Sequence, residues 1–223
     1  MLIAIVNHSP KVTTPDLAGI TAAVRRQAFE ASDAWGLTAP TVLDVATPEA
    51  APSGALLLAI LDDADQAGAL GYHSETSDGR QFARVFVSPV LDAGGTILGT
   101  SGDPSLSVSC VVSHEVIEAL GDPACNRWAD AGDKLVAIEL CDPVQGVAYV
   151  ELGVAVSDYA LPAWFDPLAA GPYSRTGAAP APFALAPGGY AIVRTAGGET
   201  QVDGTRAPHR PAHPASRTTR RGV

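Results

Sequence analysis

The chain has 223 residues, of which 47% are hydrophobic and 17% are charged. This length and composition fit one sizeable folded domain and exclude a largely disordered protein. The longest apolar run, near residues 54–61, is far too short to cross a bilayer. The formal net charge of −10 argues against nucleic-acid binding by the core.

Short apolar or alternating segments predict the strands of a sheet. In chain order they are residues 2–6, 41–45, 55–61, 71–75, 80–87, 135–140 and 147–156, and a last hairpin that starts at residue 190 and turns at 197–198. A Thr-Ser-Asp-Gly turn joins residues 71–75 to 80–87, and Pro89 is expected to end the second of these strands. Together with the helices between them, these strands predict an α+β fold.

Helical segments interrupt this series of strands. The first is expected to have Thr14 as its N-cap and Pro15 at its first position, and to end near Trp35, where Gly36 provides a stop. The second covers residues 107–121 and ends at Asp122-Pro123. Because this second helix is apolar on almost every side, we expect it to lie inside the protein.

The central helix nevertheless carries ionisable side chains. His114 and Glu118 lie one turn apart on the same face, close to Cys110 and next in sequence to Glu115. Burying a histidine and two glutamates costs free energy unless an opposite charge is present. A bound cation would supply that charge. The alternatives are a water-filled cleft along this stripe, or an ordinary solvated helix face.

The motif His114-Glu115-x-x-Glu118 resembles the HExxH motif of zincin metallopeptidases, with glutamate in place of the second histidine. The segment Glu139-Leu-Cys-Asp142 is similar to the place where gluzincins, a subset of that family, provide a third ligand. The resemblance implies a zincin-like mixed sheet with a central active-site helix and a smaller irregular C-terminal lobe. It also implies Zn²⁺ bound by His114, Glu118 and Glu139, with Glu115 as the general base that hydrolyses a peptide or amide bond of a protein substrate.

Other parts of the site are assigned less directly. The resemblance gives Asp142 and Asp122 as outer carboxylates or alternative ligands. The family also supplies a group that stabilises the oxyanion formed during hydrolysis. Sequence spacing does not distinguish Tyr149, Tyr159 and His73 as candidates for this role. Two carboxylates beside one histidine make the cation a weaker Lewis acid and relax its selectivity toward Mn²⁺, Fe²⁺ or Ca²⁺.

The three cysteines allow further interpretations. Cys110, Cys125 and Cys141 could join His114 in a closed zinc site, although their spacing matches no standard zinc motif. An odd number of cysteines does not indicate a disulfide-stabilised scaffold. We therefore expect Cys125 and Cys141 either to be free thiols or to form a single disulfide bridge. The wider pattern, including VFVSP, SHEVIEALGDP and ELCDP, is similar to phage and actinobacterial proteins. This favours a second hypothesis, a non-catalytic structural or assembly protein of a phage or contractile-injection particle.

A boundary near residue 124 is expected to separate a sheet-plus-helix lobe, residues 1–124, from a C-terminal lobe of the same domain, residues 125–205. Residues 206–223 form a basic, Pro-rich tail that contains arginines and no acidic residue. We expect this tail either to be a solvated terminus or to dock on an acidic protein partner. No signal peptide or membrane segment is visible, which predicts a cytoplasmic protein or a particle assembled in the cytoplasm.

Overall fold

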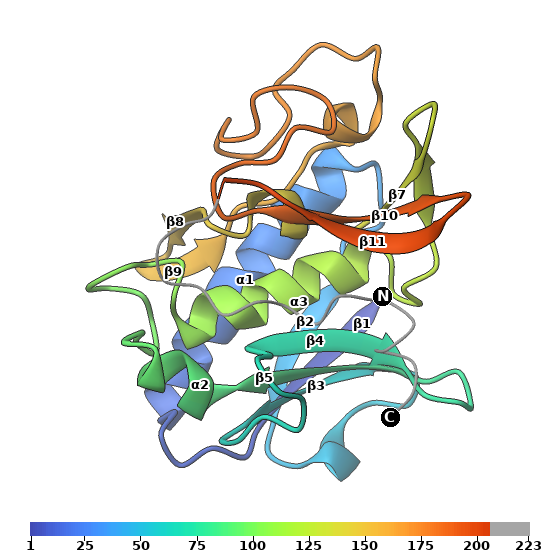
Figure 1. The fold of residues 1–223 in the computed structure, drawn as a ribbon. Helices are drawn as coiled ribbons and strands as arrows, with labels where there is room; N and C mark the ends of the chain where they lie inside the picture. The colour runs from blue at the N-terminus through green and yellow to red at the C-terminus, as the bar shows by residue number, and fades with distance from the viewer. Residues whose placement is uncertain (206–223) are drawn as a thin grey trace.

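The structure is a computed structural model that describes residues 1–205; the predicted basic tail, residues 206–223, lies outside the described residues. Its main sheet has five strands in the order β2-β1-β3-β5-β4 (Figure 1). The bounds are β1 Leu2–Asn7, β2 Thr41–Val45, β3 Leu56–Leu61, β4 Gly71–Glu75 and β5 Gln81–Phe86. Neighbouring strands are parallel except β4, which pairs antiparallel with β5 at one edge. The predicted α+β class with a mixed sheet is confirmed.

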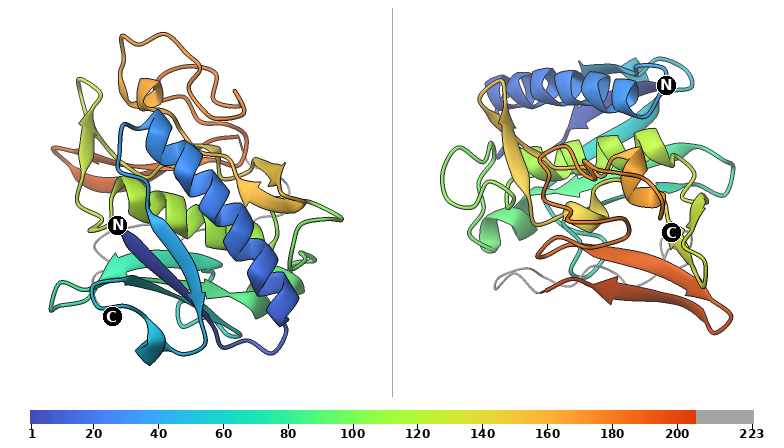
Figure 2. Two further views of the ribbon diagram at one scale, coloured as in Figure 1. Left: turned by 180° about the vertical axis from the view of Figure 1, so that it is seen from behind. Right: turned by 90° about the horizontal axis from the view of Figure 1, so that it is seen from above.

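The helices are α1 Thr14–Ala34, α2 Val87–Asp92 and α3 Val108–Gly121. α1 joins the parallel strands β1 and β2 and packs along α3, and the two long helices lie on the same side of the main sheet (Figures 1 and 2). Along β3, side chains alternate between buried and half-buried. The buried ones belong to the core that the helices cover, as expected for a sheet with one apolar face.

The C-terminal half adds smaller β elements. β6 Trp128–Asp130, β7 Leu135–Ala137, β10 Tyr190–Thr195 and β11 Gly198–Asp203 form an antiparallel sheet in the order β11-β10-β7-β6. β8 Ala148–Glu151 and β9 Val154–Ser157 form a separate hairpin. Short 3₁₀ segments cover Pro48–Ala50, Asp142–Val144 and Pro162–Phe165. The α-helices α1, α2 and α3 therefore all lie between Thr14 and Gly121, and the described part of the chain after Gly121 consists of short strands, 3₁₀ segments and loops.

Both halves contribute to the main hydrophobic core. This cluster reaches from Ile3 to Tyr159 and includes side chains of the main sheet, α1, α3 and β9. A smaller cluster surrounds Trp164, whose indole Nε1 donates to Ala184 O at 2.8 Å. The boundary near residue 124 stays a prediction, but the residues on its two sides pack into one core. Among residues 1–205, no helix has the length and apolar character needed to cross a membrane.

In the first half, the structure differs from the sequence prediction at two element ends. The N-cap of α1 is Thr13 rather than Thr14: Thr13 Oγ1 accepts from Asp16 N, and Asp16 Oδ2 accepts from Thr13 N at 3.0 Å. This reciprocal capping box explains the earlier start. β5 ends at Phe86, and Pro89 lies in the first turn of the unpredicted helix α2 instead of only ending a strand. Proline is tolerated there because a first-turn N–H has no intrahelical partner.

In the second half, two predicted strands are shorter or divided. β7 ends at Ala137 rather than Leu140, and Glu139 N donates to Ala137 O at 3.0 Å in a local turn. Residues 147–156 form the hairpin of β8 and β9 instead of one strand. The turn between them places Leu152 and Gly153 at φ values of 49° and 82°. Positive φ at both central residues is the geometry of a two-residue hairpin turn, which a simple apolar pattern does not reveal.

Candidate metal centre

α3 brings ionisable side chains into the interior. Its N-cap Ser107 accepts from Cys110 N at 3.2 Å, and all of its residues are buried. On one flank, Ser113 Oγ accepts from Ser157 N at 2.7 Å, which fixes the helix against β9. On another, His114, Glu115 and Glu118 are 6%, 2% and 1% exposed. The predicted stripe is therefore not a solvated helix face.

His114, Glu118 and Asp142 form a group whose potential ligand atoms all lie within 4.8 Å of one another. His114 Nε2 is 3.0 Å from Glu118 Oε1 and 3.3 Å from Asp142 Oδ1. His114 and Glu118 thus come together as the sequence predicts. The third member of this group is Asp142, which the sequence analysis named as an alternative ligand, whereas the role of Glu139 as third ligand stays a prediction.

Close backbone packing fixes the position of Asp142. The 3₁₀ segment Asp142–Val144 begins at this residue, and Pro143 O accepts from Ala186 N at 2.9 Å. Gly189, just before β10, lies so close that a Cβ atom there would be 2.1 Å from Pro143 O. The loop that leads into β10 therefore fixes the backbone of the segment that carries Asp142.

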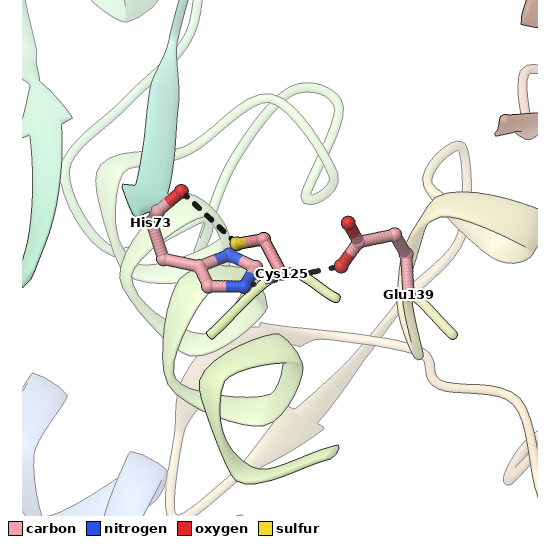
Figure 3. Close-up of side chains that lie close together, drawn as sticks. All are labelled: His73, Cys125 and Glu139. Atoms are coloured by element: carbon pink, nitrogen blue, oxygen red, sulfur yellow. Dashed lines mark hydrogen bonds and ion pairs between the residues drawn. The ribbon is translucent and has the colours of Figure 1, made fainter. Parts of the chain in front are cut away.

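His73, on β4, is the member of the cluster that sequence reasoning assigned least specifically. Its side chain is fully buried, with Nδ1 3.5 Å from Glu115 Oε2 and 3.4 Å from Glu118 Oε2. Its other nitrogen, Nε2, is 3.9 Å from Glu139 Oε2 (Figure 3). A histidine in a hairpin strand gives no sequence signal for this role, because only the packing of β4 on α3 brings it to the carboxylates.

Asp122, expected as an outer carboxylate, organises the loop that follows α3. Its carboxylate accepts from Asn126 N at 3.1 Å and Arg127 N at 2.7 Å, and its carbonyl oxygen accepts from Cys125 N at 3.1 Å. The same carbonyl oxygen lies 3.2 Å from His73 Nε2. Asp122 therefore fixes the conformation of the loop beside the cluster, because its carboxylate accepts hydrogen bonds from two backbone amides of that loop.

The charges of the cluster shift its pKa values. Burial alone would lower the pKa of His114, but the carboxylates of Glu118 and Asp142 raise it well above its usual value. Burial and the neighbouring Glu118 charge raise the pKa of Asp142 to about 7. Although burial opposes it, His114 keeps the pKa of Glu118 well below its usual range. In the described part of the chain, protonated His114 balances the charge of Glu118 and Asp142.

The donor atoms of this group fit a divalent cation. Among the described residues, Glu118 Oε1 and both carboxylate oxygens of Asp142 are buried, and apart from the contacts of Glu118 Oε1 and Asp142 Oδ1 with His114 Nε2 they make no hydrogen bond. Buried carboxylate oxygens without hydrogen-bond donors are costly, and a metal ion satisfies them directly. One imidazole nitrogen and carboxylate oxygens are ligands that zinc and several other divalent ions accept.

A pocket of about 300 Å³, which includes its open mouth, leads to this group. Its lining includes His114, Glu115, Gly71 and Gln145. Gly71 is required where it stands, because a Cβ atom there would be 2.9 Å from Glu115 Oε1 and 2.7 Å from Val111 Cγ1. His114 and Glu115 can therefore be reached from solvent through the pocket while Glu118 and Asp142 stay behind them.

The other predicted candidates lie elsewhere. Cys110, Cys125 and Cys141 are buried thiols that form no disulfide, so the optional Cys125–Cys141 bridge is not formed. None of the metal-ligand groups found among residues 1–205 combines these cysteines with His114. The Arg175 guanidinium lies over the Tyr149 ring, 5.2 Å from the ring centroid. Among the described contacts, none joins Tyr149 to the candidate metal ligands.

Comparisons with known proteins add little to this geometry. No protein-family model and no curated protein matches the chain. One solved structure, titled "GM1 bound form of the ECX AB5 holotoxin", has a chain with 11% identity and a TM-score of 0.28. The match covers 54% of this chain and 49% of that chain, so it spans about half of each. A TM-score this low does not indicate a shared fold.

Proposed function

We propose that the protein is a metal-dependent hydrolase of peptide or amide bonds, built on a zincin-like arrangement of sheet and active-site helix. The observation that carries this proposal is the group of His114, Glu118 and Asp142 beside a pocket that Glu115 also lines. A cation site with an adjacent carboxylate and access for a substrate contains the elements of metal-assisted hydrolysis.

In this proposal His114, Glu118 and Asp142 hold the cation, with zinc as the ion implied by the resemblance. A bound divalent cation supplies a Lewis acid that polarises the carbonyl and lowers the pKa of water. Two carboxylates in the ligand set reduce that effect by neutralising the ion's charge. We therefore expect a slow hydrolase rather than a fast one.

Glu115 is the proposed general base. It takes a proton from water at the pocket and later gives that proton to the leaving amine. Its Oε2 lies 3.5 Å from His73 Nδ1. Its other oxygen, Oε1, lies beside Gly71, which has no side chain to contact it. His73 thus orients the carboxylate, and Gly71 provides room beside it.

The decisive experiment compares wild type with Glu115→Gln on a general protein or peptide substrate, after the bound metal has been measured. We expect the wild type to contain stoichiometric metal and to cleave slowly. Loss of a general base should reduce the rate by about 10²–10⁴-fold while the metal content stays unchanged. The measurements are elemental analysis of the purified protein and a cleavage assay.

Glu49→Gln is the matched control, because Glu49 is an exposed glutamate outside the pocket. It should leave the rate unchanged. A wild-type protein that binds no metal at His114 and Glu118 would contradict the hydrolase proposal. Bound metal with no activity dependent on Glu115 would instead support the second hypothesis, a structural or assembly protein on the same scaffold.

A further inference from the structure

A second group of potential metal ligands lies next to the first. It consists of His73, Cys125 and Glu139, whose ligand atoms lie within 4.8 Å of one another and whose exposed fractions are 0%, 2% and 2%. The side chains come from β4, from the loop after α3 and from the turn after β7, and they point toward one another (Figure 3). None of these residues belongs to the group of His114, Glu118 and Asp142.

The two nitrogens of His73 face different surroundings. Nδ1 lies 3.5 Å from Glu115 Oε2 and 3.4 Å from Glu118 Oε2. A ring proton is most favourable on the nitrogen that faces these carboxylates. Nε2 lies 3.2 Å from the Asp122 carbonyl oxygen, which only accepts hydrogen bonds, so a metal ion at Nε2 would take the place of a proton there.

The surroundings of Nε2 consist of further electron-pair donors. Glu139 Oε2 is 3.9 Å away, the Asp122 carbonyl oxygen is 3.2 Å away, and the Cys125 sulfur completes the group. The Cys125 thiol donates to His73 O at 3.6 Å, and either a proton on Nε2 or a cation between these atoms balances the charge of the Glu139 carboxylate. Nitrogen, sulfur and oxygen donors together form the mixed ligand set that zinc accepts.

The loop that carries Cys125 is held in an unusual conformation. Cys125 has a φ of 50°, in the left-handed region that residues with a side chain rarely adopt. The hydrogen bonds of Asp122 to the amides of Cys125, Asn126 and Arg127 maintain this conformation. Strained backbone of this kind is frequent at functional sites, where the surrounding contacts must support it.

We propose that His73 Nε2, Cys125 Sγ and the Glu139 carboxylate bind a second divalent cation, zinc by preference, separate from the cation at His114, Glu118 and Asp142. On binding, the Cys125 thiol releases its proton to solvent and its sulfur forms a bond to the metal. The ion also fixes the tautomer of His73, so that Nδ1–H points at Glu115 and Glu118. The second ion is thus a structural one that orients the residues of the first site.

The test uses metal-free, full-length protein titrated with Co²⁺, which substitutes for zinc and absorbs light. Wild type should bind a second equivalent of Co²⁺ and develop a near-ultraviolet thiolate-to-cobalt charge-transfer band. Cys125→Ser should lose that band and one equivalent of metal. The buried cysteines Cys110 and Cys141 provide matched controls, because Cys110→Ser and Cys141→Ser should retain the band. A band that persists in Cys125→Ser, or its absence from wild type, would overturn the proposal.

A second measurement needs no substitution and therefore does not depend on the variant folding. Zinc X-ray absorption of the wild-type protein should show a sulfur neighbour at about 2.3 Å. A zinc environment of nitrogen and oxygen alone would mean that His73 is simply protonated at both nitrogens, and would refute the second site. Because the group of His114, Glu118 and Asp142 contains no sulfur, these readouts are independent of whether the protein is a hydrolase.

Discussion

At the scale of single residues, buried carboxylates are used in two different ways. Asp142 and Glu118 have buried oxygens without hydrogen bonds, which suits a metal ligand. Asp158 is also fully buried, but it accepts from Tyr159 N at 2.9 Å, Thr176 N at 3.0 Å and Thr176 Oγ1 at 2.6 Å. A carboxylate whose oxygens accept several hydrogen bonds stabilises the fold, whereas one paired only with a histidine has lone pairs available to a metal ion.

Asp158→Ala should therefore lower stability. The substitution removes the acceptor of the buried Tyr159 N–H and of the exposed Thr176, and we expect a loss of about 1–3 kcal/mol in the free energy of unfolding. Urea unfolding followed by circular dichroism measures this loss. Asp166→Ala is the control, because Asp166 is exposed and, among the described contacts, its carboxylate accepts only from Leu168 N. Equal effects of the two substitutions would show that burial of Asp158 contributes nothing.

At the scale of elements, close approaches between backbones position the ligands. β4 places His73 against α3 only because Gly71 has no side chain to meet Val111 and Glu115. The segment at Asp142 is held in the same way, because Gly189 packs against Pro143 O. Glycine is the only residue that permits such contacts without moving the chain.

Gly189→Ala tests this positioning. The added methyl group would lie 2.1 Å from Pro143 O, so the segment that carries Asp142 must shift. We expect a loss of stability of about 1–3 kcal/mol, together with weaker zinc binding, measured by competition with a chromophoric chelator. Gly197→Ala should change neither property, because its Cβ would meet only Thr195 Oγ1, at 3.5 Å. Unchanged zinc affinity in Gly189→Ala would contradict the role of Asp142 as a ligand.

At the scale of the whole molecule, the candidate ligands connect distant parts of the chain. β4 supplies His73, α3 supplies His114 and Glu118, and the segment after β7 supplies Glu139 and Asp142. An ion held by these residues binds the folded chain but not the unfolded one, so binding and folding are coupled.

Zinc should therefore stabilise the entire described fold rather than one loop. At a free zinc concentration of 100 times the dissociation constant, the expected gain is about 2.7 kcal/mol in the free energy of unfolding. Thermal unfolding with zinc and with excess chelator measures it. His114→Ala should remove the part of the gain that comes from the site of His114, Glu118 and Asp142. A melting temperature that does not respond to chelator would argue against any bound metal.

Local sequence patterns were enough to predict the α+β class, most of the strands, both long helices, and the pairing of His114 with Glu118. These features depend on local periodicity and on the spacing of residues one helical turn apart. Tertiary structure alone decided that Asp142 joins His114 and Glu118, and that His73 meets Cys125 and Glu139. Those contacts join residues that are far apart in the chain, and they depend on Gly71, Gly189 and the left-handed Cys125. No periodic pattern encodes such approaches, because they are set by how α3 packs between its neighbours.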